Sequence, residues 1–300
     1  MVKKNVLILV NENKDNNFEF TKTVVSFLKE KGCRVFVEEE VGKKVEEVEV
    51  FNNETTGVDF ALILGGDGTL LNYAHKYKSD FPFFGINLGR VGALTEASTD
   101  NYKFKLQEIL DGNYFIEERN TIDCKIMKNN ELYFEDIAFN EVSLQRGKLY
   151  KMLYINMFIN NNNKTSFFAD GVVVATSTGS SAFSLSCGGP LLLPTARNFV
   201  ITPISPQLRT ITSLVINDTD LISINLEEHV IREDFIQEKP IVVVDGYKMI
   251  EIDRDSEILM SKSEKKLKIV RVDGQASLFE PTFRVSMSNQ NIKKMGGNYE

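Results

Sequence analysis

The feature that most constrains the fold of this sequence is a change of pattern near residue 112. Before it, short apolar runs alternate with segments of helical spacing, and after it strand-like runs follow one another with only turns between them. Alternating strands and helices predict a mostly parallel sheet with helices on both faces. Closely spaced strands without helices predict a sandwich or an open barrel. The chain has 300 residues, which is enough for two such domains.

In the first part we expect strands at 6–10, 34–37, 58–64 and 83–86, and helices at 18–28, 69–77 and 102–110. In the second part, strand-like runs cover 122–127, 132–144, 153–159, 166–168, 199–204, 213–216, 221–226, 241–244, 248–252, 258–260 and 267–272. Asn-Asn and Asp-Gly pairs at their joints are typical of hairpin turns. We therefore expect a two-domain α+β protein, with an N-terminal Rossmann-like α/β domain over 1–112 and a C-terminal all-β, sandwich-like domain over 113–275. Residues 276–300 form a tail that can pack back on the N-terminal domain.

Charge and cysteine content exclude several classes of protein. The net charge is −7, from 35 Lys and Arg against 42 Asp and Glu, so nucleic acid is a poor candidate partner. Three cysteines without a C-x-x-C pair fit a reducing compartment and exclude a disulfide framework or a structural zinc site. The apolar run at 5–10 is too short for a signal peptide, and the uncharged stretch 171–196 is too rich in Gly, Ser, Thr and Pro to span a bilayer. We expect a soluble cytoplasmic protein with no membrane partner.

The strongest local motif is Gly65-Gly66-Asp67-Gly68-Thr69, which follows an apolar strand and opens a helix. Open α/β sheets bind ligands at the carboxyl ends of their strands. The glycines let the backbone approach a phosphate chain, and the helix offers free N–H groups. A carboxylate in such a loop repels phosphate, so Asp67 favours a metal ligand or a base that takes a proton from an attacking hydroxyl. The alternative is a tight turn in which Asp67 caps the helix.

Two weaker patches lie further along the chain. The stretch 170–186 runs from a strand into a turn rich in Gly, Ser and Thr, which can contact a polar or phosphorylated ligand. Its alternative is a buried turn whose hydroxyls bond their own backbone. Asn140 and Glu141 set an amide beside a carboxylate that can accept both hydroxyls of a ribose, and here the alternative is a solvated strand.

Other catalytic signatures are missing from the sequence. No G-x-G-x-x-G follows the first strand, no G-K-[ST] occurs, and no serine lies in a G-x-S-x-G elbow. His75 and His229 lie in no metal-ligand pattern. No metal site made by protein side chains is therefore expected.

Taken in order, these motifs closely resemble the ATP-dependent NAD kinase family. The resemblance runs from about 58 to 246 and is carried by 65–69, 85–92, 140–141, 170–171, 178–183, 188–190, 202–206 and 245–246. It implies a kinase that moves a phosphoryl group from ATP to the 2′-hydroxyl of the adenosine ribose of NAD, giving NADP. It also implies Mg²⁺, held through the nucleotide phosphates, and assembly as a homodimer or homotetramer.

Carried over by position, the resemblance makes Asp67 the general base and places Gly65, Gly66, Gly68 and Thr69 in the phosphate loop. It assigns NAD contacts, partly across a subunit interface, to Asn140, Glu141, Asp170, Thr178, Ser181, Ala182, Phe183, Ser184, Leu185 and Ser186. The sequence departs from the family pattern at Asn72, Ser177, Ser181, Phe183, Gln207 and Tyr247. Because several departures fall on the substrate side, two alternatives stay open. One is a kinase of the same superfold for another nucleotide or for a lipid or polyol hydroxyl, and the other is a non-catalytic sensor of NAD or NADP. The phosphoryl donor and the choice between NAD and NADH also stay open.

Overall fold

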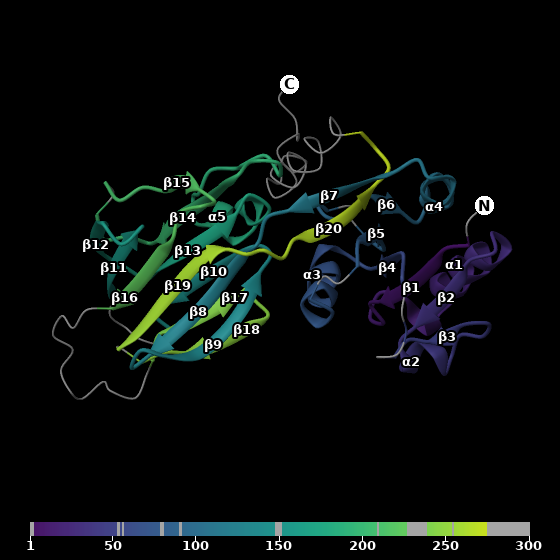
Figure 1. Cartoon of the computed structure of the whole chain (residues 1–300), viewed down its shortest axis with the longest axis horizontal. Coiled ribbons are helices and arrows are strands. Elements are labelled where there is room, and N and C mark those ends of the chain that lie inside the picture. Colours follow the sequence, from purple (N-terminus) through teal and green to yellow (C-terminus); the bar gives the residue numbers. More distant parts are fainter. Residues whose placement is uncertain are drawn as a thin grey trace, which may run out of the picture. The chain divides into compact units, whose positions relative to one another are not determined.

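The computed structural model describes residues 3–52, 55, 57–78, 81–89, 92–147, 152–208, 210–226, 239–253 and 255–274. The chain divides into two compact units (Figure 1), the first made of Met1–Glu118 and the chain from Leu267 onward, the second of Arg119–Lys266. The expected tail at 276–300 lies outside the described residues. Within the described ranges, no helix is long and apolar enough to cross a membrane.

A parallel sheet forms the centre of the first unit. Its strands are β1 (Asn5–Val10), β2 (Arg34–Val37), β3 (Glu49–Val50), β4 (Phe60–Leu64), β5 (Phe83–Asn87), β6 (Ala97–Ser98), β7 (Phe115–Arg119) and β20 (Leu267–Arg271). They are ordered β3-β2-β1-β4-β5-β20-β7, with β6 beside β5. The pairs from β3 to β20 are parallel, and every residue of β4 and β5 is buried. Strands covered on both faces are apolar throughout, as the sequence pattern predicts.

The helical segments of this unit are η1 (Asn16–Phe18), α1 (Glu19–Glu30), α2 (Glu39–Gly42), α3 (Asp67–Lys76) and α4 (Tyr102–Asp111). The buried residues of α1 are Thr21, Val24, Val25 and Leu28. This spacing of three and four residues gives one apolar stripe toward the sheet. α4 ends at Gly112, whose φ of +89° is the left-handed conformation that glycine adopts without strain. α3 packs on β4 and β5, so its N-terminus follows directly from the carboxyl end of β4.

Among the strands of the first sheet, one was expected in the β-rich domain and another was not expected as a strand. The run 267–272 was read as part of the β-rich domain, but β20 lies between β5 and β7 in the parallel sheet. β7 lies within the range 113–275 that was assigned to the β-rich domain, where no strand was expected at 115–119, and it ends at Arg119, where the second unit begins. A strand's own residues show that it is buried but not which neighbours bury it, so a chain that leaves a sheet and later returns to it cannot be read from periodicity.

The second unit contains two antiparallel six-stranded sheets, ordered β15-β14-β13-β10-β17-β18 and β12-β11-β16-β19-β8-β9. Their strands are β8 (Ile122–Lys128), β9 (Glu131–Ala138), β10 (Glu141–Gln145), β11 (Leu153–Ile159), β12 (Asn163–Ala169), β13 (Gly171–Thr176), β14 (Asn198–Ile204), β15 (Leu214–Asn217), β16 (Ile222–Leu226), β17 (Ile241–Val244), β18 (Lys248–Glu251) and β19 (Ser256–Lys262). Short helical turns η2 (Gly179–Ser181) and α5 (Phe183–Ser186) follow β13. Buried residues of both sheets, such as Val174 and Ile258, form one core. This is the sandwich expected from the sequence.

The hairpin turns follow the predicted chemistry. Asn129 and Asn130, between β8 and β9, have φ of +52° and +64°. Asp245 and Gly246, between β17 and β18, have φ of +48° and +65°. Two successive residues with positive φ are what a type I′ turn requires, and its twist matches that of the strands it joins.

Candidate active site

A pocket of about 530 Å³ lies at the N-terminus of α3 in the first unit. It is lined by Asn11, Lys14, Gly66, Asp67, Gly68, Thr69, Asn72, Asn87 and Gly92. These residues come from the segments that follow β1, β4 and β5, together with the first turns of α3. Because parallel neighbouring strands end at one edge of the sheet, the fold brings these segments together there. The N–H groups of Thr69 and Leu70 donate to the Gly66 carbonyl, which leaves the N–H groups of Asp67 and Gly68 available to an anion among the described residues of this turn.

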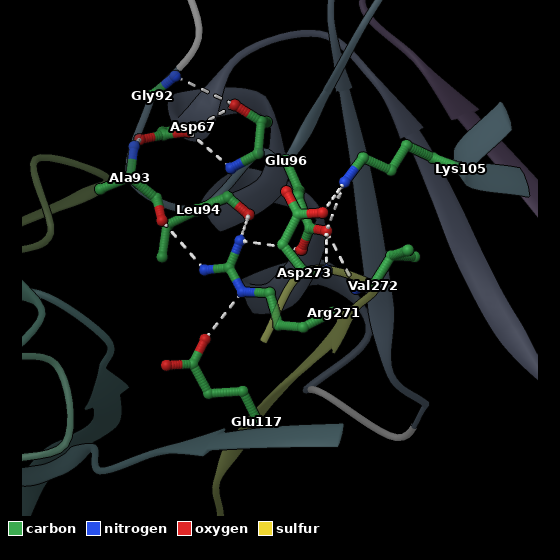
Figure 2. Close-up of polar contacts among 11 residues, drawn as sticks. Asp67, Gly92, Ala93, Leu94, Glu96, Lys105, Glu117, Arg271, Val272 and Asp273 are labelled. Carbon is green, nitrogen blue, oxygen red and sulfur yellow. Dashed lines mark hydrogen bonds and ion pairs between the residues drawn. The ribbon is translucent and has the colours of Figure 1, made fainter. Parts of the chain in front are cut away.

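The Asp67 carboxylate is fixed by three hydrogen bonds from the loop after β5 (Figure 2). Oδ2 accepts from the Ala93 N–H at 2.7 Å, and Oδ1 accepts from the Thr95 N–H and hydroxyl, both at 3.1 Å. The Thr95 hydroxyl itself accepts from Asn87 Nδ2 at 3.1 Å and from the Gly92 N–H at 3.2 Å. Since a hydroxyl has one proton to donate, these two donors leave that proton for Asp67.

This geometry excludes the helix-capping alternative for Asp67. Gly66 is the N-cap of α3, Asp67 is its first residue, and the carboxylate bonds to residues 93–95 instead of the helix. A methyl group at Gly92 would overlap the carboxylate, so the absence of a side chain there lets Asp67 approach the loop. Of the predicted loop residues, Gly66, Gly68 and Thr69 line the pocket with Asp67, while Gly65 packs against Thr69.

Sequence reasoning missed Lys14, the one basic side chain among the described residues that line the pocket. Its Nζ lies 3.3 Å from where a Cβ on Gly66 would stand, so the ammonium is directly beside the glycine loop. The segment after β1 was considered only for a glycine motif, which is absent there. A positive charge following β1 was the available signal, because β1 and β4 are adjacent parallel strands and their carboxyl ends meet at the same edge.

In the second unit, Asp245 holds the backbone of the Asn140–Glu141 motif in place. Its carboxylate accepts from the N–H groups of Phe139, Asn140 and Glu141 at 2.7, 2.8 and 2.8 Å. The Asn140 carbonyl accepts from the Thr176 N–H at 2.8 Å, and a Cβ on Gly179 would overlap that carbonyl. The turn after β13 therefore packs closely on the start of β10.

Glu141 is a buried carboxyl with spare hydrogen-bonding capacity. It is 8% exposed and accepts from the backbone N–H of Phe183. Burial, and secondly the negative charge of Asp245, raise the pKa of Glu141 to about 8. Its Oε2 is buried and bonds to no residue that the structure describes. Most buried polar atoms in proteins have a partner, so this oxygen keeps the capacity for a further hydrogen bond.

The hydroxyls of the turn after β13 bond mainly within the protein. Ser181 Oγ donates to the Thr178 carbonyl at 3.1 Å, and Ser184 Oγ lies 2.9 Å from Thr202 Oγ1 in the interior. Thr178 Oγ1 accepts from Arg119 at 3.3 Å. The bond of Ser181 to the Thr178 carbonyl is of the kind that the alternative for this turn predicts, whereas Ser184 and Thr178 bond to the side chains of Thr202 and Arg119.

The other predicted NAD-binding residues divide between two ends of the sheet. Ala182, Phe183 and Leu185 are half-buried and Ser186 is exposed, all beside the turn at the Glu141 end. Asp170 precedes β13 and pairs with Arg146 at 3.2 Å. β13 has six residues, so Asp170 lies roughly 20 Å of strand away from Thr178. The structure therefore gathers the predicted residues around Glu141 but not Asp170.

No cluster of three or more His, Cys, Asp or Glu side chains that could hold a metal occurs within the described part of the chain. Asp67 is the single carboxylate among the residues lining the first pocket.

Comparison with known proteins identifies both units. Residues 6–114 match the ATP-NAD kinase N-terminal domain, and residues 139–272 match the ATP-NAD kinase C-terminal domain. The chain is 34% identical over 275 residues to an NAD kinase of Thermoanaerobacter sp. (strain X514), covering 90% of this chain and 94% of that protein. It is 32% identical over 276 residues to an NAD kinase of Lachnoclostridium phytofermentans, covering 91% and 95%.

Solved structures agree with this match. A yeast NADH kinase complexed with NADH superposes with a TM-score of 0.82 over 99% of this chain and 89% of that chain, and at 20% identity it supports the fold alone. An NAD kinase from Archaeoglobus fulgidus in complex with ATP gives a TM-score of 0.71 at 26% identity, over 95% and 99%. With both domains matched and relatives above 30% identity over nine-tenths of its length, the chain belongs to the NAD kinase family.

Proposed function

We propose that this protein is an NAD kinase, which transfers the terminal phosphoryl group of ATP to the 2′-hydroxyl of the adenosine ribose of NAD to give NADP. One observation carries the proposal for this chain. A carboxylate, Asp67, is held by three hydrogen bonds in a pocket made of glycines, helix amides and a lysine. Glycines, amides and lysine suit phosphates, whereas the carboxylate suits a hydroxyl that must lose its proton.

In this mechanism Asp67 acts as the general base. Among the described residues its Oδ2 accepts one hydrogen bond, from Ala93, and so keeps a lone pair for the proton of the 2′-hydroxyl. As that proton moves to Asp67, the ribose oxygen bonds to the γ-phosphorus and the bond to the leaving ADP breaks. The protein supplies position and charge complementarity, which is most of what phosphoryl transfer requires.

The phosphates of ATP are assigned to Gly66, Gly68, Thr69 and the first amides of α3, with Lys14 neutralising charge beside Gly66. Lys14 thus offers the basic group that the family often places where Asn72 stands here. If Mg²⁺ accompanies the ATP phosphates, it would neutralise further negative charge during the transfer. The residues of the pocket that would offer oxygen ligands to such a hard ion are Asn11, Asn72, Asn87 and Asp67.

NAD is assigned to the second unit, around Glu141. The unsatisfied Oε2 of Glu141 suits a ribose hydroxyl, and Asn140, Thr178 and residues 181–186 provide polar groups and the Phe183 ring around it. The separation of Asp170 from this group favours its assignment to a ligand shared with a second subunit. The proposal therefore includes a homodimer or homotetramer, which size-exclusion chromatography with light scattering tests directly.

We place this activity in the reducing cytoplasm, since the three cysteines are free thiols and two of them, Cys33 and Cys124, are buried. Burial raises the pKa of both thiols, which suits inert packing groups rather than redox groups.

The deciding experiment measures NADP formed from ATP, Mg²⁺ and NAD with an NADP-specific dehydrogenase, with NADH run in parallel as acceptor. Asp67→Asn should lower kcat by about two orders of magnitude or more, because it removes a general base. Asp59→Asn is the matched control, since Asp59 accepts hydrogen bonds from Asn5 N and Lys4 in the same unit and lies in no pocket described here. Dinucleotide binding without turnover in folded protein would replace the kinase by a sensor. An absence of both would direct the search to another acceptor hydroxyl.

A further inference from the structure

Arg271 is a buried cation that the reaction as described above does not use. It is the last residue of β20, 2% exposed, and lies on the side of the 93–96 loop away from Asp67 (Figure 2). Its Nη2 donates to the Ala93 carbonyl at 3.0 Å and its Nη1 to the Leu94 carbonyl at 3.4 Å. Its Nε donates to Glu117 of β7 at 2.8 Å.

The same short loop therefore has a cation on its carbonyls and an anion on its amides. The Leu94 carbonyl and the Thr95 N–H belong to a single peptide group, which accepts from Arg271 at one end and donates to Asp67 at the other. Ala93 donates its N–H to Asp67 and accepts from Arg271 at its carbonyl, although these two groups belong to successive peptide groups. Hydrogen bonds joined through one peptide group polarise each other, so the guanidinium strengthens the donor that Asp67 meets.

Glu96 also ties the end of β20 to this loop, and its Oε2 lies 3.7 Å from Arg271 Nη1. Glu96 Oε1 accepts from the N–H groups of Val272 and Asp273, both at 2.9 Å, and the buried Lys105 pairs with Glu96 at 3.4 Å and with Asp273. The backbone that carries Arg271 is thus held in place beside the groups that its guanidinium contacts, which are the Glu117 carboxylate and the carbonyls of Ala93 and Leu94. A rigid support of this kind positions a reacting group better than a free loop does.

We infer that Arg271 is a positioning residue for phosphoryl transfer, which fixes the orientation of Asp67 through the backbone of residues 93–95. The inference rests on the proposed role of Asp67 as general base. It assigns a part in the reaction to a strand that lies far from the glycine loop in sequence.

The test is Arg271→Lys, which keeps a positive charge beside Glu117, but its compact ammonium cannot occupy the three separate positions from which Nε, Nη1 and Nη2 reach Glu117, Leu94 and Ala93. We expect kcat to fall by about 10- to 100-fold, while the KM values for ATP and NAD change by less than about threefold. Arg34→Lys is the matched control, because Arg34 bonds Glu49 through two nitrogens on the exposed side of the same sheet, and its kcat should equal that of the unmodified protein.

A double-mutant cycle separates positioning from general destabilisation. In an Asp67→Asn background, Arg271→Lys should cause no further loss of kcat, because the group that it positions no longer accepts a proton. An equal loss in both backgrounds, or an unchanged kcat in Arg271→Lys alone, overturns the inference and leaves the role of Asp67 intact. A normal kcat in Asp67→Asn overturns the proposed base and the inference together.

Thermal unfolding of each variant accompanies these assays. Should Arg271→Lys fail to fold, Glu117→Gln makes the same test, because it removes the charge that holds Arg271 Nε without changing the shape of the side chain. A smaller loss of kcat, again absent in the Asp67→Asn background, is expected for Glu117→Gln. An unchanged kcat in Glu117→Gln overturns the inference.

Discussion

Replacing Gly92 with alanine should disable the enzyme by displacing Asp67. An alanine Cβ at this position would overlap the Asp67 carboxylate, so one of the two groups must move. Asp67 carries the three hydrogen bonds from Ala93 and Thr95, and rotation of its side chain would break all of them. The substitution therefore separates the carboxylate from its supporting loop while adding only one methyl group to the lining of the pocket.

The size of the effect follows from these contacts. A hydrogen bond to a charged acceptor contributes about 1.5–3 kcal/mol, but the displaced carboxylate regains water in the open pocket. We therefore expect the free energy of unfolding to fall by about 2–4 kcal/mol, which is less than the sum of three such bonds. A general base moved by about 1 Å loses on the order of 100-fold in kcat.

The measurement is kcat for NADP formation, with thermal unfolding to register the loss of stability. Gly89→Ala is the matched control from the same loop region, because a Cβ there meets only Asn87 Oδ1, at an ordinary 3.6 Å. Gly89→Ala should keep kcat within about threefold of the unmodified protein. A folded Gly92→Ala variant with normal kcat would refute the assignment of Asp67 as a base held by this loop.

Two further variants test the proposed properties of Lys14 and Glu141. Lys14→Ala should raise the KM for ATP about tenfold, equivalent to ~1.4 kcal/mol, with little change in kcat. The control is Lys22→Ala, at an exposed position of α1, which should leave both constants unchanged. Equal KM values for the two variants would remove Lys14 from the phosphate site. Glu141 has its folded-state pKa raised from 4.5 to about 8, so wild-type stability falls as pH rises between these values. Glu141→Gln carries no such proton, so the stability of this variant relative to the unmodified protein should grow across that range, by a few kcal/mol at most, and then level off. Urea unfolding of both proteins at pH 5 and pH 9 measures this difference, and the same difference at the two pH values would contradict the prediction.

Much of the fold was predictable from local sequence patterns. The strands before residue 112 are apolar runs and the helices have one buried stripe, so both periods are visible in the chain itself. The Asn129-Asn130 turn adopts positive φ because of its residue types, and so it too was predictable. The glycine loop was found for the same reason, since its position between a strand and a helix is a property of neighbouring residues.

The support of the site was not predictable in this way. The partners of Asp67 are residues 93–95, those residues are held by Arg271, and Lys14 reaches the pocket from the segment after β1. Each belongs to a different element, and none carries a motif of its own. Asn140 and Glu141 were found by resemblance, but their support by Asp245 comes from a turn more than a hundred residues later.

The sequence by itself determined which segments become strands, helices and tight turns, because these depend on side-chain period and on backbone preferences within a few residues. Only the tertiary structure decided that β20 returns to the parallel sheet beside β5, and that an arginine at its end braces the loop bonded to Asp67. Strand order and the convergence of side chains depend on contacts between residues far apart in the chain. Those contacts are selected by the burial and hydrogen bonding of the whole fold, which no local pattern contains.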